Sequence, residues 1–184
     1  MFRAFIEKID NSFLKLSNPY VAHMNIKNIL QSYKPDILNE IIEEYIYDNY
    51  DQIEKITEIN KNKLCYRFIL HKSDKYDIVH IKWEKGFQSD KHPHSKFDNV
   101  MYVINDGCLV EHIFKYWNIE DIFVRCATVK LKYGEIEYKL NNDEIHKIIA
   151  KEYTETLHIN IHDIKAVGRC FRLFRRNKNK ITNK

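Results

Sequence analysis

The apolar residues change their spacing near residue 64, and this change constrains the fold more than any other feature. Beyond that point short runs alternate apolar and polar residues, as around Val79, Ile81 and Trp83, which share one face. Asn, Asp and Gly separate the runs, and Asp106-Gly107 predicts a hairpin turn. Many short strands joined by turns indicate a β-sandwich or β-barrel. Further runs of this kind are 100–104, 108–114, 122–131, 145–149, 156–161 and 166–171.

The preceding segment follows the helical period instead. Phe2, Phe5 and Ile9 recur at intervals of three and four, which predicts an amphipathic helix. A Ser-Asn-Pro sequence then interrupts the pattern before a second short apolar face over 26–33. Pro35 suits the first turn of a third helix, because an N–H at that position would have no partner within the helix.

These two patterns predict one mainly β domain with helices packed on it. The 184 residues are enough for a single domain of ordinary size. We expect N-terminal helices over 1–60 and a β-barrel over 61–172, together forming a domain over 1–172. A basic tail over 173–184 follows.

The net charge of +4 is concentrated at the C-terminal end. The last sixteen residues contain seven Lys and Arg and no acid, so the remainder carries −3. A basic tail can contact nucleic acid. Its only aromatic residues are Phe171 and Phe174, and no nucleic-acid motif accompanies them, so we expect a solvated tail and no nucleic-acid partner.

Cysteine content and hydropathy indicate the cellular compartment in which the protein works. Four cysteines lie far apart without a C-x-x-C pair, whereas disulfide frameworks are typical of shorter, cysteine-dense secreted chains. The first residues include acids where a signal peptide would be apolar, and no apolar run reaches the roughly 20 residues of a membrane span. We therefore expect reduced thiols in a cytoplasmic protein that binds no membrane. We also expect a monomer.

The most informative motif is the pair His92-x-His94. Two residues separated by one point to the same side of a strand, so the two imidazoles can hold one metal ion. Neutral imidazole suits Fe, Zn, Cu and Ni. A third ligand must come from elsewhere, and His146 follows about fifty residues later, far enough to return across a barrel. The alternative is that the pair lies on the surface of a polar loop.

The motifs around this pair resemble the cupin superfamily, and within it the cysteine dioxygenase family. Gly86-x5-His92-x-His94, followed by Gly107, resembles the first cupin motif, and His146 resembles the histidine of the second. The resemblance covers about residues 60–165. Further matches to the dioxygenase family are Tyr66-Arg67, W-x-x-G at 83–86, G-x-L-x-E-x-x-F at 107–114, N-D at 142–143 and part of S-x-H-x-Y at 156–160.

The resemblance implies a cupin-type jelly-roll barrel that holds a mononuclear Fe(II) through His92, His94 and His146. Three neutral ligands leave a doubly charged ion with open positions for a substrate thiolate and for O2. The implied reaction converts cysteine, or a similar small thiol, to the sulfinic acid. Arg67 then holds the substrate carboxylate through its planar fork. His158 resembles a histidine that orients the reactants or shuttles a proton.

Two departures from the family leave alternatives open. Asn160 stands where the family often has Tyr, and Asn99 replaces a cysteine that some members crosslink. Asp98 could instead supply a fourth ligand. Arg67 could pair with a nearby acid, and His158 could be a structural histidine. The substrate could be another thiol carboxylate such as 3-mercaptopropionate, or the chain could be a catalytically degenerate cupin that serves as a metal- or ligand-binding module.

Overall fold

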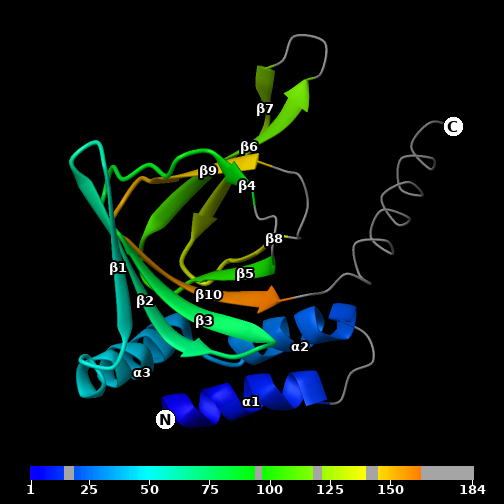
Figure 1. The fold of residues 1–184 in the computed structure, drawn as a ribbon, viewed down its shortest axis with the longest axis vertical. Helices are drawn as coiled ribbons and strands as arrows, with labels where there is room; N and C mark the ends of the chain where they lie inside the picture. The colour runs from blue at the N-terminus through cyan, green and yellow to red at the C-terminus, as the bar shows by residue number, and fades with distance from the viewer. Residues whose placement is uncertain (15–18, 94–96, 118–121, 140–144, 163–184) are drawn as a thin grey trace, which may run out of the picture.

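The computed structural model describes residues 1–14, 19–93, 97–117, 122–139 and 145–162. Within these ranges three helices precede the strands, as Figure 1 shows, and the predicted mainly β fold with N-terminal helices is confirmed. The helices are α1 (Phe2–Leu14), α2 (Pro19–Gln31) and α3 (Pro35–Asp48). The strands are β1 (Glu54–Asn60), β2 (Lys63–Lys72), β3 (Tyr76–Trp83), β4 (His92–Pro93), β5 (Phe97–Val103), β6 (Cys108–Trp117), β7 (Ile122–Lys132), β8 (Ile136–Lys139), β9 (Ile145–Ala150) and β10 (Thr154–His162).

The helices form as their apolar spacing predicts. Phe5 and Ile9 of α1 are fully buried, as are Leu38 and Ile42 of α3, and they share one core with the six-stranded sheet. Pro35 stands in the first turn of α3, where its missing N–H leaves no helical hydrogen bond unmade. The helical layer therefore covers one face of that sheet (Figure 1).

Strands β3 to β10 form an eight-stranded jelly roll of two sheets. One sheet has the order β1-β2-β3-β10-β5-β8, and the other has the order β4-β9-β6-β7. The chain passes between the sheets so that the first strand of the eight pairs with the last and the second with the seventh. This is the jelly-roll strand order, and cupins are built on it. The strand order by itself assigns the fold.

Strand β1 corrects the predicted boundary between helices and strands. The sequence prediction placed helices over 1–60, but Glu54–Asn60 pairs with β2 in a hairpin at the edge of the sheet. The hairpin turns at Lys61 and Asn62, both with positive φ, as a two-residue turn requires. Ile56 and Ile59 are exposed on this edge strand, so its burial pattern has no period of two to reveal it.

The predicted hairpin at Asp106-Gly107 is wrong, because this turn joins two different sheets. Strand β5 belongs to the six-stranded sheet and β6 to the four-stranded sheet. The Asn105 side-chain oxygen accepts hydrogen bonds from the N–H groups of Gly107 (3.1 Å) and Glu155 (2.8 Å). These bonds hold the turn against the start of β10, so the chain crosses over instead of folding back.

The two faces of β3 separate two cores. Val79, Ile81 and Trp83 point between the sheets, as their alternation predicts, while Ile78 points toward the helices.

Among the described residues, no helix is both long and apolar enough to cross a membrane. The predicted run 166–171 and the basic tail lie outside the described residues, so the division at 172 stays a prediction.

Candidate functional site

A cavity lies between the two sheets and gathers most of the predicted site residues. Its volume is about 170 Å³, close to the roughly 150 Å³ of a protein cavity that accepts benzene. This volume limits a ligand to a small molecule. Apolar side chains of β3, β5 and β9 form much of the wall. The polar side chains that line it include Arg67, His92, Asn99, His146, His158 and Asn160.

His92 and His146 lie beside each other on neighbouring strands. The sequence suggested that His146 returns across the barrel, but β4 and β9 are hydrogen-bonded neighbours, and the two residues are directly opposite in their register. Opposite residues of an antiparallel pair point to the same side of the sheet. The ring centroids are 4.4 Å apart, and the two Nε2 atoms are 3.0 Å apart.

The Nδ1 atoms of both rings face hydrogen-bond acceptors. His92 Nδ1 lies 2.9 Å from the Asp90 carbonyl oxygen, and His146 Nδ1 contacts a carboxylate oxygen of Glu111. In a neutral imidazole one nitrogen carries hydrogen and the other carries a lone pair. Each Nδ1–H therefore donates, and in the neutral form of both rings each Nε2 directs a lone pair toward the other ring.

This arrangement fits a shared cation. Two lone pairs at 3.0 Å repel each other unless a positive charge lies between them. Bonds from a metal ion to imidazole nitrogen are about 2.1 Å long, so two nitrogens at this separation could both bind one ion. Metal-bound histidines usually donate their other N–H to a carboxylate or a backbone carbonyl, and both kinds of acceptor occur here.

Burial keeps His92 ready to bind a metal. Desolvation lowers the pKa of its imidazole, and the neighbouring His146 and Arg67 lower it further, against the opposing effect of the Asp90 carbonyl. The ring is therefore neutral at pH 7, which is the form that binds metals. His94, the predicted partner of His92, lies outside the described residues.

Glu111 is a site residue that the sequence reasoning did not assign. It belongs to the G-x-L-x-E-x-x-F match, and its side chain is completely buried behind His146. A buried carboxylate normally has a hydrogen-bond or ionic partner, whose interaction energy offsets the cost of removing it from water. Glu111 lies two residues after the buried Leu109 on the same face of β6, and an acid on a buried strand face was the signal that could have identified it.

Arg67 lines the cavity and also forms an ion pair. Its Nε lies 2.8 Å from Glu58 Oε1 on the adjacent strand β1, as the alternative interpretation anticipated. About a third of each side chain is exposed, 31% for Arg67 and 40% for Glu58. Solvent-screened pairs of this kind contribute at most about 1 kcal/mol, so the guanidinium can exchange partners at small cost.

His158 is held at both nitrogens inside the cavity wall. The Asn99 amide nitrogen lies 3.2 Å from His158 Nδ1, and Thr156 Oγ1 lies 2.9 Å from His158 Nε2. The Trp83 indole N–H donates to the same Thr156 oxygen at 2.8 Å. An amide N–H can only donate, so Nδ1 accepts and Nε2–H donates to Thr156. The ring is neutral and fixed in orientation.

The two asparagines that depart from the family pattern face each other. Asn99 on β5 and Asn160 on β10 are directly opposite, and the Asn99 amide donates to Asn160 Oδ1 at 2.6 Å. This hydrogen bond links the strands at the positions where the resemblance suggested cysteine and tyrosine. The asparagine pair also fixes the amide that contacts His158.

Asp98 is excluded as a fourth ligand of the cavity. Successive residues of a strand point to opposite faces, and Asn99 occupies the cavity face. Asp98 is buried toward the helical layer, where its carboxylate lies 3.4 Å from His23 Nε2 of α2. The sequence alternative that gave Asp98 a ligand role is therefore wrong.

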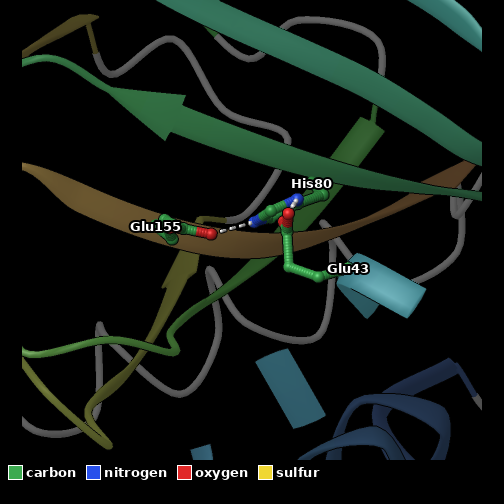
Figure 2. A group of neighbouring side chains, drawn as sticks. All are labelled: Glu43, His80 and Glu155. Carbon is green, nitrogen blue, oxygen red and sulfur yellow. Dashed lines mark ion pairs between the residues drawn. The ribbon is translucent and has the colours of Figure 1, made fainter. Parts of the chain in front are cut away.

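A second group of potential metal ligands lies on the helical face of the six-stranded sheet. Glu43 of α3, His80 of β3 and Glu155 of β10 each direct one ligand atom to within 4.8 Å of the others (Figure 2). His80 lies between Val79 and Ile81, which line the cavity, so it points away from the cavity. This group and the cavity are two separate sites.

The sequence matches no protein-family model and no curated protein. Solved structures with similar folds include the Fe(II)-bound HEPD of Streptomyces albus, at 12% identity and a TM-score of 0.49. That alignment covers 67% of this chain but only 27% of HEPD. A cupin-2 domain protein of Shewanella frigidimarina is 21% identical with a TM-score of 0.41, covering 52% and 79% of the two chains. A predicted oxalate decarboxylase of Thermotoga maritima is 17% identical with a TM-score of 0.46, covering 60% and 92%.

Proposed function

We propose that this protein is a non-haem Fe(II) thiol dioxygenase that converts cysteine, or a similar small thiol, and O2 to the sulfinic acid. The balanced reaction adds both oxygen atoms to sulfur, so the thiol RSH and O2 give RSO2H. Sulfur loses four electrons and O2 gains them. The observation that carries the proposal is the pair of converging Nε2 atoms, 3.0 Å apart, in a small cavity that Arg67 also lines.

His92 and His146 would hold the iron, with His94 as the third ligand by the sequence pattern. The bound Fe(II) would supply the positive charge that favours a thiolate and the redox chemistry that O2 requires. Glu111 accepts the Nδ1–H of His146 and so favours the tautomer whose Nε2 can bind the iron. The Asp90 carbonyl does the same for His92.

Arg67 would bind the substrate carboxylate. A guanidinium matches a carboxylate with two parallel hydrogen bonds, and the partly exposed pair with Glu58 is weak enough to yield. His158 would orient the bound substrate, because Asn99 and Thr156 hold its ring in one position. The apolar wall formed by Val79, Ile81 and Met101 would exclude water from the reacting atoms.

The test is oxygen uptake by the full chain loaded anaerobically with Fe(II). Cysteine and 3-mercaptopropionate are added separately, and mass spectrometry measures the sulfinate. We expect one O2 consumed per sulfinate formed. Arg67→Gln should raise the KM for the active thiol at least tenfold with unchanged iron content, because only the carboxylate contact is lost. Lys63→Gln on the same strand serves as the control and should behave as the wild type.

A second candidate function is a cupin that binds metal or ligand without catalysing oxidation. The Asn99–Asn160 hydrogen bond favours it, because neither amide can replace a tyrosine hydroxyl in acid–base chemistry. One iron per chain with no oxygen uptake by any thiol would favour this candidate over the dioxygenase. Loss of thiol oxidation without loss of iron in Arg67→Gln would support the dioxygenase.

A further inference from the structure

The cluster of Glu43, His80 and Glu155 has the organisation of a ligand set. His80 is fully buried, and Figure 2 shows its ring between the two carboxylates. Its Nε2 lies 3.0 Å from Glu155 Oε2, and its Nδ1 lies 3.5 Å from Glu43 Oε1. The three residues come from a helix and two adjacent strands, so the cluster joins the helical layer to the sheet.

Each carboxylate uses its second oxygen on an outer partner. Lys82 Nζ lies 2.7 Å from Glu43 Oε2, and the Tyr153 hydroxyl donates to Glu155 Oε1 at 2.7 Å. These contacts orient the carboxylates so that Glu43 Oε1 and Glu155 Oε2 remain directed at His80. Outer partners that fix the orientation of ligand carboxylates are a regular feature of protein metal sites.

The inward atoms lack the hydrogen bonds that buried polar atoms normally make. Glu43 Oε1, Glu155 Oε2 and both His80 nitrogens are buried, yet none makes a hydrogen bond within the described residues. The carboxylate oxygens lie at ion-pair distance from the ring nitrogens, 3.0 Å for Glu155 and 3.5 Å for Glu43. Such a group of buried atoms calls for an explanation, and a bound ion is one.

The local charge also favours a cation. Two carboxylates and the Lys82 ammonium leave one negative charge around His80.

We propose that Glu43, His80 and Glu155 form a second metal site, which binds a divalent ion such as Zn²⁺ and fastens α3 to the six-stranded sheet. One imidazole and two carboxylates suit Zn²⁺, with water at the remaining position. The part of Glu43 that is exposed gives the ion an entry path, since 41% of its side chain is accessible. This site does not depend on the proposed dioxygenase activity.

The test measures Zn²⁺ binding to the metal-free full chain by calorimetry and by elemental analysis after gel filtration. The background is His92→Ala/His146→Ala, which removes the cavity ligands. We expect one Zn²⁺ per chain in this background and at least tenfold weaker binding after adding Glu155→Gln or Glu43→Gln. Glu152→Gln is the matched control, because this carboxylate pairs with Lys85 on the surface, and it should leave binding unchanged.

Absence of Zn²⁺ binding in the background variant would overturn the proposal and identify the cluster as an ion-pair network around His80. Equal binding with and without Glu155→Gln and Glu43→Gln would also overturn it. If the background variant fails to fold, the wild type gives the same information, with two Zn²⁺ per chain expected and one after Glu43→Gln. Oxygen uptake by the iron-loaded wild type is measured separately, so failure of this site and failure of the dioxygenase are distinguishable.

Discussion

The Nε2 atoms of His92 and His146 lie 3.0 Å apart at the wall of the cavity. The hydrogen-bond acceptors behind the rings create this arrangement, because they fix which nitrogen carries the hydrogen. The Asp90 carbonyl belongs to the backbone, so substitution cannot remove it. Glu111 is a side chain, and its role is therefore open to mutation.

Glu111→Gln should weaken metal binding in the cavity by about 10- to 100-fold, as loss of an outer partner of a ligand histidine usually does. The amide keeps the size of the carboxylate but removes the charge that favours His146 as an Nδ1–H donor. Metal affinity measured with a competing chelator in the Glu43→Gln background isolates the cavity. An affinity equal to that of this background alone would contradict the role given to Glu111.

At the scale of elements, strand alternation lets β3 and β10 serve two sites. Val79 and Ile81 face the cavity while His80 between them faces α3. On β10, His158 lines the cavity whereas Glu155 faces the helical side. A shift of one residue in either strand would exchange the two faces, so the turns that set the strand starts matter for both sites.

Gly107 packs against Thr154, the residue at which β10 begins. A Cβ at this position would lie 2.4 Å from Thr154 Oγ1 and 2.5 Å from Thr154 Cα, in the first residue of β10. Gly107→Ala should therefore lower the free energy of unfolding by about 2 kcal/mol or more, because backbone has to move. Urea denaturation measures the change. Asp106→Ala, at an exposed neighbouring position, should stay within about 0.5 kcal/mol of the wild type, and a similar value for Gly107→Ala would disprove the clash.

At the scale of the whole molecule, helices and strands share a single core. The apolar faces of α1, α2 and α3 pack with Ile78, Val100 and Leu157 of the six-stranded sheet. A second core, which includes Trp83 and Phe87, fills the space between the sheets beside the cavity. Because the six-stranded sheet contributes to both cores, loss of the helical layer should destabilise the cavity as well.

Phe5→Ala should lower the free energy of unfolding by about 3–5 kcal/mol, since Phe5 is fully buried in the helical core. Circular dichroism at 222 nm follows the helices, and the fluorescence of Trp83 in a Trp117→Phe background follows the core between the sheets. The two transitions should coincide and shift together. Separate transitions would show that the helices and the jelly roll unfold as independent units.

The sequence alone determined the features that depend on local chain geometry. Helical spacing placed α1, α2 and α3, and alternation identified β3, β5, β6, β7, β9 and β10, because apolar period follows directly from backbone conformation. The short strands β4 and β8 contain too few residues to show an alternation. The spacing of the histidines also selected His92 and His146. The sequence did not predict the edge strand β1, because its residues are mostly exposed and show no apolar period of two.

The tertiary structure decided everything that depends on which distant segments become neighbours. Only the pairing of β4 with β9 places His146 beside His92, and only the packing of β10 turns Asn105–Gly107 into a crossing between sheets. The same holds for Glu111 behind His146 and for the cluster around His80. Each joins residues at least 35 positions apart, and strand register and helix packing bring them together.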